Sequence, residues 1–150
     1  MANVPVLIFD WKELPNIATN IWHAQMAGWE RILTYRGPLP NPESSGIRRK
    51  TMTYYVRNRA TGDDDRYEVP VIPGHERDEY PFACTVEGSS RGGNRSVWVN
   101  PVPAGENNRQ GRLISAFIAE HDITAHGPNR RFEVRIVNHP RGPVLPPLSA

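Results

Sequence analysis

The stretch GHERDEYPFA, residues 74–83, decides where the surface of this protein ends and its core begins. Its first half places five ionisable side chains in a row at positions 75–79, and its second half turns apolar at once. Pro81 has no N–H to donate, which bars this segment from a central position in a sheet. We therefore predict that Asp78 and Glu79 lie where the chain leaves solvent and turns into the core.

A carboxylate at such a turn needs a physical explanation. An ionised carboxylate in an apolar environment costs several kcal/mol unless it is paired, hydrogen-bonded or bound to a metal ion. The other interpretation is a solvated charged turn before a buried strand, because charged side chains are mostly found at protein surfaces. The residue types alone leave both interpretations open.

The length of 150 residues predicts one domain spanning residues 1–150. The formal net charge is only +2, and the sequence pI is about 8.9. Arginine outnumbers lysine heavily, and guanidinium groups suit phosphate oxygens, so the composition favours a phosphate-rich partner. A basic surface kept for solubility would look the same. The arginines assigned to phosphate contact are Arg48, Arg49, Arg91, Arg95 and Arg109.

The single cysteine and the hydropathy pattern exclude several classes of protein. Cys84 has no partner within the chain, so neither an internal disulfide nor a cysteine-based zinc site is possible. No window approaches the ~18 apolar residues of a membrane span, and residues 1–10 lack the regions of a signal peptide. We expect a soluble chain without a membrane partner that tolerates a reducing compartment.

Apolar periodicity predicts the regular elements in the first part of the chain. Short apolar runs predict strands at Val4–Phe9 and Arg31–Tyr35. Pro15–Gly28 has the pattern of a helix, because proline suits the first turn, apolar residues recur at helical spacing and glycine suits the end. Residues 37–46 are rich in proline, asparagine and serine and predict a loop.

The middle of the chain predicts a β-hairpin. β-Rich segments at Thr51–Val56 and Tyr67–Ile72 flank a connection that contains three adjacent aspartates at 63–65. Calcium loops space their carboxylates alternately and close with a glutamate, so we assign no metal site to this acidic tip.

After the central stretch, a strand and a second long helix are predicted. Ser96–Val99 is expected to form a strand that ends at the proline-rich residues 100–103. Apolar pairs at helical spacing then predict a helix that runs to about His121. Glu106 and Asn107 stand at its start, where an N-cap and an acidic first turn are the plain interpretation.

The end of the chain predicts one more strand and a tail. Phe132–Val137 alternates between apolar and polar residues, which is typical of a half-buried strand. The proline-rich residues 139–150 carry no pattern of buried positions, so we expect an extended tail that is ordered only where it lies along the surface.

The wording of the central stretch is similar to the central motif of a known family. G-x-x-R-D-E-Y-P-x-A, followed by Glu87-Gly88, resembles the motif of the NucA/NucB deoxyribonucleases, which are small metal-dependent endonucleases. Further patterns of that family follow in order, and the resemblance covers about residues 15–137. They are P-x-x-A-x-x-I-x-x-A-x-x-A-G with a later L-T (Pro15, Ala18, Ile21, Ala24, Ala27-Gly28, Leu33-Thr34), a basic pair (Arg48-Arg49), and P-x-x-[DE]-N-x-x-x-G (Pro103, Glu106, Asn107, Gly111).

The resemblance implies an α+β fold. A small antiparallel sheet and a few helices would form a ββα-metal-like nuclease core at about residues 4–138, with the hairpin at about 51–72 as an insertion and residues 139–150 as the tail. Family members grip one divalent ion at the scissile phosphate, so the implied activity is metal-dependent endonucleolytic hydrolysis of DNA. Mg²⁺ or Mn²⁺ suits the oxygen-rich ligands.

The resemblance also assigns roles within the central stretch. Asp78 is the predicted general base that activates water, and His75 is the alternative base, as in histidine-using ββα-metal sites. Glu79 is expected to support the site, and Arg77 is the predicted phosphate clamp.

The predicted metal ligands lie beyond this stretch. Asn107 is expected to reach the ion from the start of the helix, and Glu87 to orient the ion or a water bound to it. Glu106 is either a further ligand or only part of the helix start. The arginines named above are expected to bind the phosphates of the DNA backbone.

A toxin context is the last expectation. The pattern at residues 15–28 is similar to that of C-terminal nuclease domains in polymorphic toxins such as Rhs effectors. Secreted bacterial members tend to carry two cysteines at positions that fall here on Leu33 and Thr85, and a missing bridge suits a reducing cytosol. We expect the toxin domain of a larger secreted effector, delivered by a secretion apparatus into the target-cell cytoplasm and neutralised by a cognate immunity protein.

Two alternatives stay open. One is an ordinary intracellular nuclease of the same fold, and the other is a nucleic-acid-binding or catalytically inactive domain. An inactive homologue would be expected to lose Asp78, Glu79 or Asn107, and all of them are present.

Overall fold

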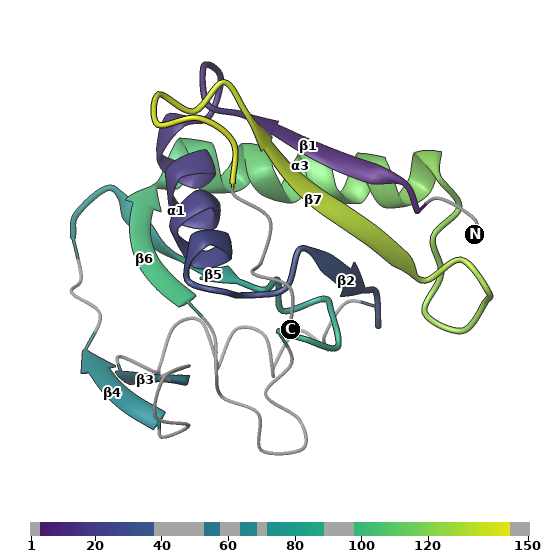
Figure 1. Ribbon diagram of the computed structural model, residues 1–150, viewed down its shortest axis with the longest axis horizontal. Helices are drawn as coiled ribbons and strands as arrows, with labels where there is room; N and C mark the ends of the chain where they lie inside the picture. Colours follow the sequence, from purple (N-terminus) through teal and green to yellow (C-terminus); the bar gives the residue numbers. More distant parts are fainter. Residues whose placement is uncertain (1–3, 38–52, 58–63, 69–71, 89–97, 145–150) are drawn as a thin grey trace.

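The computed structural model describes residues 4–37, 53–57, 64–68, 72–88 and 98–144. The fold is α+β, as predicted, with helices packed against small sheets (Figure 1). In the described part of the chain the elements are β1 (Val6–Asp10), α1 (Pro15–Met26), β2 (Ile32–Thr34), β3 (Thr53–Arg57), β4 (Asp64–Glu68), β5 (His75–Tyr80), β6 (Trp98–Pro103), α3 (Ala104–Glu120) and β7 (Arg131–Val137).

A mixed sheet joins the two ends of the chain. Its order is β1-β7-β2, with β7 in the centre, parallel to β1 and antiparallel to β2. β7 alternates as predicted, because Phe132, Val134 and Ile136 are buried and the residues between them are more exposed. β1 and β7 can pair in parallel because the chain between them, which includes α1 and α3, supplies the long crossover that a parallel pair needs.

α1 confirms the predicted first helix. It begins at Pro15 and ends at Met26, two residues before Gly28. Gly28 has a φ of 101°, a left-handed conformation that glycine adopts without strain at a helix end. The apolar residues at helical spacing are completely buried, and they are Ile17, Ala18, Ile21 and Ala24.

β5, β6 and α3 form a ββα unit. β5 and β6 pair antiparallel, and α3 begins directly after β6 and contacts both strands. We predicted that this strand ends at the proline-rich residues 100–103, but β6 continues through Pro101 to Pro103. These prolines lie two residues apart, so both nitrogens face the same edge of the strand. Among the described strands β6 pairs only with β5, and its other edge needs no N–H donor.

The predicted hairpin is present with shifted strands. β3 and β4 pair antiparallel in a register that sets Arg57 opposite Asp64 and Thr53 opposite Glu68. Two residues of the expected acidic tip, Asp64 and Asp65, therefore belong to the second strand. The rest of the tip lies outside the described residues.

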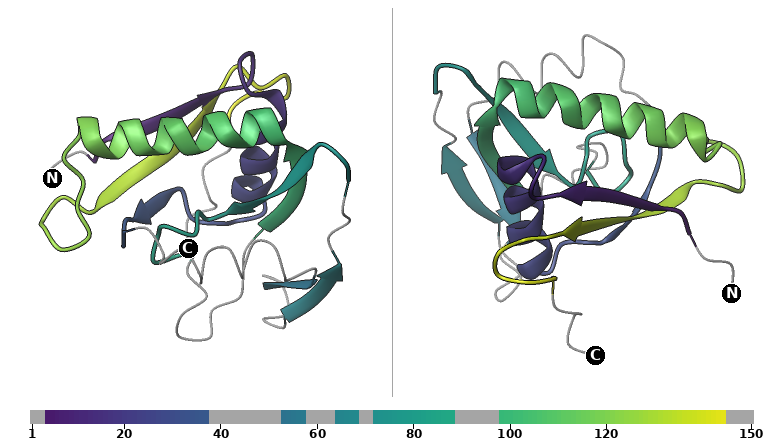
Figure 2. Two further views of the ribbon diagram at one scale, coloured as in Figure 1. Left: turned by 180° about the vertical axis from the view of Figure 1, so that it is seen from behind. Right: turned by 90° about the horizontal axis from the view of Figure 1, so that it is seen from above.

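Aromatic side chains connect the sheets and helices in one core. α3 runs beside the β1-β7-β2 sheet (Figure 2), and Phe117 of the helix packs against Phe132 of β7 with ring centroids 5.7 Å apart. Phe82, just after β5, packs against Phe9 of β1 at 6.1 Å. Within the described residues, no helix is long and apolar enough to cross a membrane.

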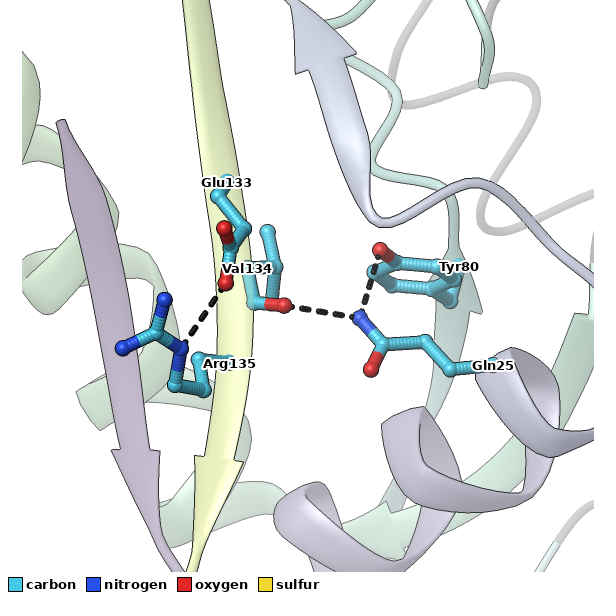
Figure 3. Close-up of polar contacts among 5 residues, drawn as sticks. All are labelled: Gln25, Tyr80, Glu133, Val134 and Arg135. Carbon is cyan, nitrogen blue, oxygen red and sulfur yellow. Dashed lines mark hydrogen bonds and ion pairs between the residues drawn. The ribbon is translucent and has the colours of Figure 1, made fainter. Parts of the chain in front are cut away.

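Buried polar contacts hold α1 between these parts. Gln25 is 4% exposed, and its amide donates hydrogen bonds to the Tyr80 hydroxyl at 3.0 Å and to the Val134 carbonyl at 2.9 Å (Figure 3). The Tyr80 hydroxyl donates in turn to the carbonyl of Glu30. One glutamine side chain thereby ties the first helix to β5 and to β7.

The first residues of the expected tail lie along the surface of α1. The His139 ring stacks on Trp22 with centroids 4.4 Å apart, and the Trp22 indole N–H donates to the Gly142 carbonyl at 2.9 Å. The Arg141 guanidinium lies over the same Trp22 ring. Residues 145–150 of the expected tail are outside the described residues.

Candidate active site

Among the residues that the structure describes, Asp78 is the charged side chain that is buried. It lies in β5 and is only 3% exposed, so the predicted inward turn is present. Asn20 of α1 donates to Asp78 Oδ2 at 2.8 Å, and Gln110 of α3 donates to Oδ1 at 2.7 Å. The carboxylate is therefore hydrogen-bonded on both oxygens, which removes much of the penalty for burying it.

The surroundings of Asp78 set its proton affinity. Burial raises the pKa of the carboxyl to about 6, against the amide hydrogen bonds from Gln110 and Asn20, which lower it. The neighbouring charge of Glu79 contributes to this rise in the pKa, and the backbone N–H of Glu79 opposes it. A carboxylate with a pKa near 6 is ionised at neutral pH but holds a proton far better than an exposed aspartate does.

Asn107 stands one helical turn before Gln110 and is linked to the same network. Gln110 Nε2 also donates a hydrogen bond to Asn107 Oδ1 at 3.3 Å. Asn107 Nδ2 in turn donates to Glu76 Oε2 at 2.6 Å. Because Glu76 and Asp78 are two residues apart in β5, they lie on the same face of the strand. α3 starts at Ala104, and its N-cap residue is Pro103. Asn107 therefore lies inside the helix, and its interpretation as an N-cap is wrong.

A groove of about 640 Å³ lies between β5 and α3. Four of the predicted site residues line it together, while His75, Glu87 and Glu106 are not among its described lining residues. Its apolar part is formed by side chains that include Tyr35, Phe82, Ile114, Ile118 and Ile123. The predicted site residues in the groove are Arg77, Asp78, Glu79 and Asn107.

Glu106 is engaged at the start of α1. Its Oε1 accepts hydrogen bonds from the backbone N–H groups of Asn16 at 2.9 Å and Ile17 at 3.2 Å, and its Oε2 accepts from the Asn16 amide at 2.6 Å. α1 has no side-chain cap of its own and no acidic residue in its first turn. The Glu106 carboxylate therefore caps α1 from a distance of about 90 residues along the chain.

Glu87 ties the segment after β5 to β2. It accepts hydrogen bonds from the Thr34 N–H at 2.7 Å and from the Thr34 hydroxyl at 3.0 Å. The next residue, Gly88, has no room for a side chain, because a Cβ there would lie 2.2 Å from the Phe82 carbonyl oxygen. The L-T and E-G patterns of the sequence thus meet in space and hold each other.

The remaining predicted residues are at the surface or outside the described ranges. His75 is exposed, with its Nδ1 3.1 Å from the Pro73 carbonyl oxygen. Arg109 is exposed and lies 4.0 Å from the Glu13 carboxylate. The other arginines assigned to phosphate contact lie outside the described residues, and they are Arg48, Arg49, Arg91 and Arg95.

Sequence reasoning missed the three amides around Asp78. Asn20 is 2% exposed and accepts a hydrogen bond from Asn100 of β6 at 3.0 Å, and Gln110 is 6% exposed. A signal was available, because Asn20 lies on the apolar stripe of α1, three residues after Ile17. A polar side chain on a buried stripe must find a polar partner.

The donor set of the groove fits a hard divalent ion. The described residues contain no group of three histidine, cysteine or acidic side chains around one point. The lining of the groove instead includes Glu79 and Asn107 as well as Asp78, so carboxylate-bearing and amide-bearing residues are present there. Carboxylate and amide oxygens suit Mg²⁺ or Mn²⁺, and Mg²⁺ keeps several waters when few protein ligands are present.

The chain was compared with known proteins. A family model described as Deoxyribonuclease NucA/NucB matches residues 25–134, which is most of the chain. No match was found among curated proteins.

Proposed function

Since this chain belongs to the NucA/NucB deoxyribonuclease family, we propose that it is an endonuclease that cleaves DNA with one divalent ion in the groove between β5 and α3. The observation that carries this proposal is Asp78, a buried carboxylate that faces a groove and is held by amides from two helices. The same groove contains Asn107 and Glu79, so a proton acceptor and oxygen ligands stand together.

Hydrolysis of a phosphodiester needs a base for water, compensation of negative charge and a route for the leaving oxygen. Asp78 is ionised at neutral pH and takes a proton from the attacking water. The water oxygen bonds to phosphorus, the bond to the sugar oxygen breaks, and that oxygen receives a proton from solvent. Desolvation raises the pKa of Asp78, so its carboxylate binds a proton more tightly and is a stronger base than an exposed aspartate.

The other groove residues have supporting roles. Asn107 and Glu79 would hold Mg²⁺ or Mn²⁺, which supplies positive charge against the charge that builds on the phosphate. Arg77, also in the groove lining, would hold a phosphate oxygen, since its guanidinium fork matches phosphate geometry. Glu106 and Glu87 would act at a distance, by fixing the start of α1 and the segment after β5.

A plasmid cleavage assay tests the metal-dependent reaction. Purified protein should nick or linearise plasmid with Mg²⁺ or Mn²⁺, and exhaustive chelation should stop it. Asp78→Ala should lower the rate by about 10²–10⁴-fold while the fold is kept, because a positioned proton acceptor is lost. Asp10→Ala, which removes an aspartate carboxylate at the end of β1, is the matched control and should remain active.

Several outcomes would contradict this assignment. Cleavage that survives chelation would exclude the metal-dependent reaction. An inactive His75→Ala beside an active Asp78→Ala would make the histidine the base. A wild type that binds DNA but never cuts it with either ion would favour the nucleic-acid-binding module.

We further propose that the chain is the toxin domain of a secreted antibacterial effector, delivered into the target-cell cytoplasm and paired with a cognate immunity protein. Support comes from the toxin-like pattern at residues 15–28 and from the lone Cys84, since the fold needs no disulfide. The immunity protein should be acidic where it meets the arginines, because opposite charge speeds association and masks the DNA site. Expression in a bacterial cytosol should kill with the wild type and not with Asp78→Ala; a harmless wild type that cuts DNA when purified would exclude the toxin role alone.

A further inference from the structure

We propose that Asn20 and Gln110 are positioning residues of the hydrolysis, forming an amide clamp that holds the Asp78 carboxylate in the orientation that accepts the proton of water. The clamp consists of Asn20 from α1, Gln110 from α3 and the supporting Asn100 from β6. This inference rests on the proposed function, because it assigns to the amides an effect on the base of that reaction.

Each oxygen of the Asp78 carboxylate accepts one hydrogen bond from a side-chain amide. Asn20 Nδ2 lies 2.8 Å from Asp78 Oδ2, and Gln110 Nε2 lies 2.7 Å from Oδ1. The backbone N–H of Glu79 adds a third hydrogen bond to the carboxylate. Since a carboxylate has about four lone-pair positions, about one remains for a water in the groove. Amides donate hydrogen bonds without transferring a proton, so the clamp fixes the plane of the carboxylate and leaves its negative charge in place.

Gln110 is oriented for Asp78 at a cost in stability. Its Oε1 is buried without a hydrogen-bond partner among the described residues, and such an unsatisfied atom lowers the stability of the fold. Turning the amide over would aim this oxygen at the oxygens of Asp78 and Asn107, where both positions require a donor. The groove therefore imposes the orientation of Gln110, and the unsatisfied oxygen is its consequence.

Asn20 is oriented in the same way from the other side. Its Oδ1 accepts the Asn100 amide N–H at 3.0 Å, so its Nδ2 must face Asp78. Asn100 stands opposite Asp78 in the pairing of β5 with β6, and Asn20 is hydrogen-bonded to both of them. The clamp thus connects both helices and the hairpin at the point where the base is needed.

Loss of the clamp should act on the chemical step. Gln110→Met has a similar length and no donor, and Asn20→Leu removes the other hydrogen bond. A carboxylate displaced by about 1 Å can lower the rate by roughly 10²-fold, so kcat should fall by about that factor. KM should change little, because neither residue is assigned to DNA. The ion concentration for half-maximal activity should change little in Asn20→Leu, because Asn20 is bonded to Asp78 and Asn100 and not to the proposed ion ligand Asn107.

A kinetic double-mutant cycle tests the clamp against a merely structural role. Gln110→Met is measured alone and in the Asp78→Ala background, with folding checked by circular dichroism. We expect the tenfold-or-greater effect of Gln110→Met to disappear when Asp78 is absent, because a positioning residue acts only through its target. The matched control is Gln25→Met, which removes another buried amide of α1 whose two hydrogen bonds go to Tyr80 and Val134 and not to Asp78 (Figure 3). It should lower stability and leave kcat of the folded protein unchanged.

The cycle separates failure of the clamp from failure of the proposed function. Full kcat in Gln110→Met, or an equal loss in both backgrounds, would overturn the clamp while the nuclease assignment stands. A loss of kcat in Gln25→Met as large as that in Gln110→Met would overturn it as well. Absence of cleavage by the wild type would overturn the proposed function and the clamp with it.

Discussion

At the scale of the residue, Asp78 combines burial with charge. Its burial raises its pKa to about 6, so the ionised form at neutral pH is held at a cost in stability that the two amides only partly offset. Gln110 adds an unsatisfied oxygen at the same place. Local groups that reduce stability and gather in one groove are typical of functional sites rather than of structural ion pairs.

Asp78→Asn should therefore stabilise the protein at pH 7. The native pKa is raised from 3.8 to about 6, so the native state binds the proton more tightly than the unfolded state, and this contribution to stability is present below pH 4 and lost as the pH rises through about 6. The loss amounts to about 3 kcal/mol, at 1.36 kcal/mol per pKa unit, and asparagine avoids it.

Urea unfolding at pH 7 and pH 4 measures this effect. The free energy of unfolding of Asp78→Asn should exceed that of the wild type at pH 7, the gain should shrink towards pH 4, and DNA cleavage should be lost. Asp10→Asn is a control of opposite sign, because hydrogen bonds from the Asn138 side chain and the Lys12 N–H hold the pKa of Asp10 below its usual value. A variant Asp78→Asn that is less stable than the wild type at pH 7 would refute this account.

At the scale of the element, the start of α1 depends on α3. The N-cap residue of α1 is Leu14, which offers no side-chain hydrogen bond, and Glu106 supplies the missing acceptor from the first turn of α3. One carboxylate thereby lies near the positive ends of two helix dipoles. This contact also fixes how α1 and α3 meet, and those helices carry the two amides of the clamp.

Glu106→Ala should behave as the loss of a helix cap. We expect a decrease of about 1 kcal/mol in the free energy of unfolding, because two N–H groups of α1 lose their acceptor. The ion concentration needed for half-maximal cleavage should not change. Glu13→Ala is the control, since it removes an exposed acidic side chain near the same helix start that pairs with Arg109 at 4.0 Å. A marked rise in the required ion concentration in Glu106→Ala alone would instead support the predicted ligand role.

At the scale of the whole molecule, the groove lies where separate parts of the chain meet. β1 and β7 bring the two ends of the described chain into one sheet, and the ββα unit carries Asp78 and Asn107. α1 contacts both the sheet and the hairpin, with Gln25 bonded to each (Figure 3). The stack of His139 on Trp22 then holds the chain after β7 against the same helix. The position of Asp78 is therefore a property of the packed domain.

The sequence by itself determined the elements with strong local signals. The helix at Pro15 and the strand ending at Val137 follow from the spacing of apolar residues. The abrupt change of polarity at residues 80–83 indicated an inward turn at Asp78 but left a solvated turn open, and the structure shows that Asp78 is buried. The family also follows from the sequence, because its patterns are written along the chain. The predicted end of β6 was wrong. Prolines at one edge of a strand do not end the strand when that edge pairs with no other described strand.

Only the tertiary structure decided which polar groups meet. The partners of Asp78 lie 58 and 32 positions away, and the partner of Asn16 at Glu106 lies 90 positions away. Local sequence patterns show that a side chain is buried, but a buried amide or carboxylate gives no local indication of its partner. That choice depends on how helices and strands pack, because every buried polar group must find its hydrogen bond among neighbours brought together by the fold.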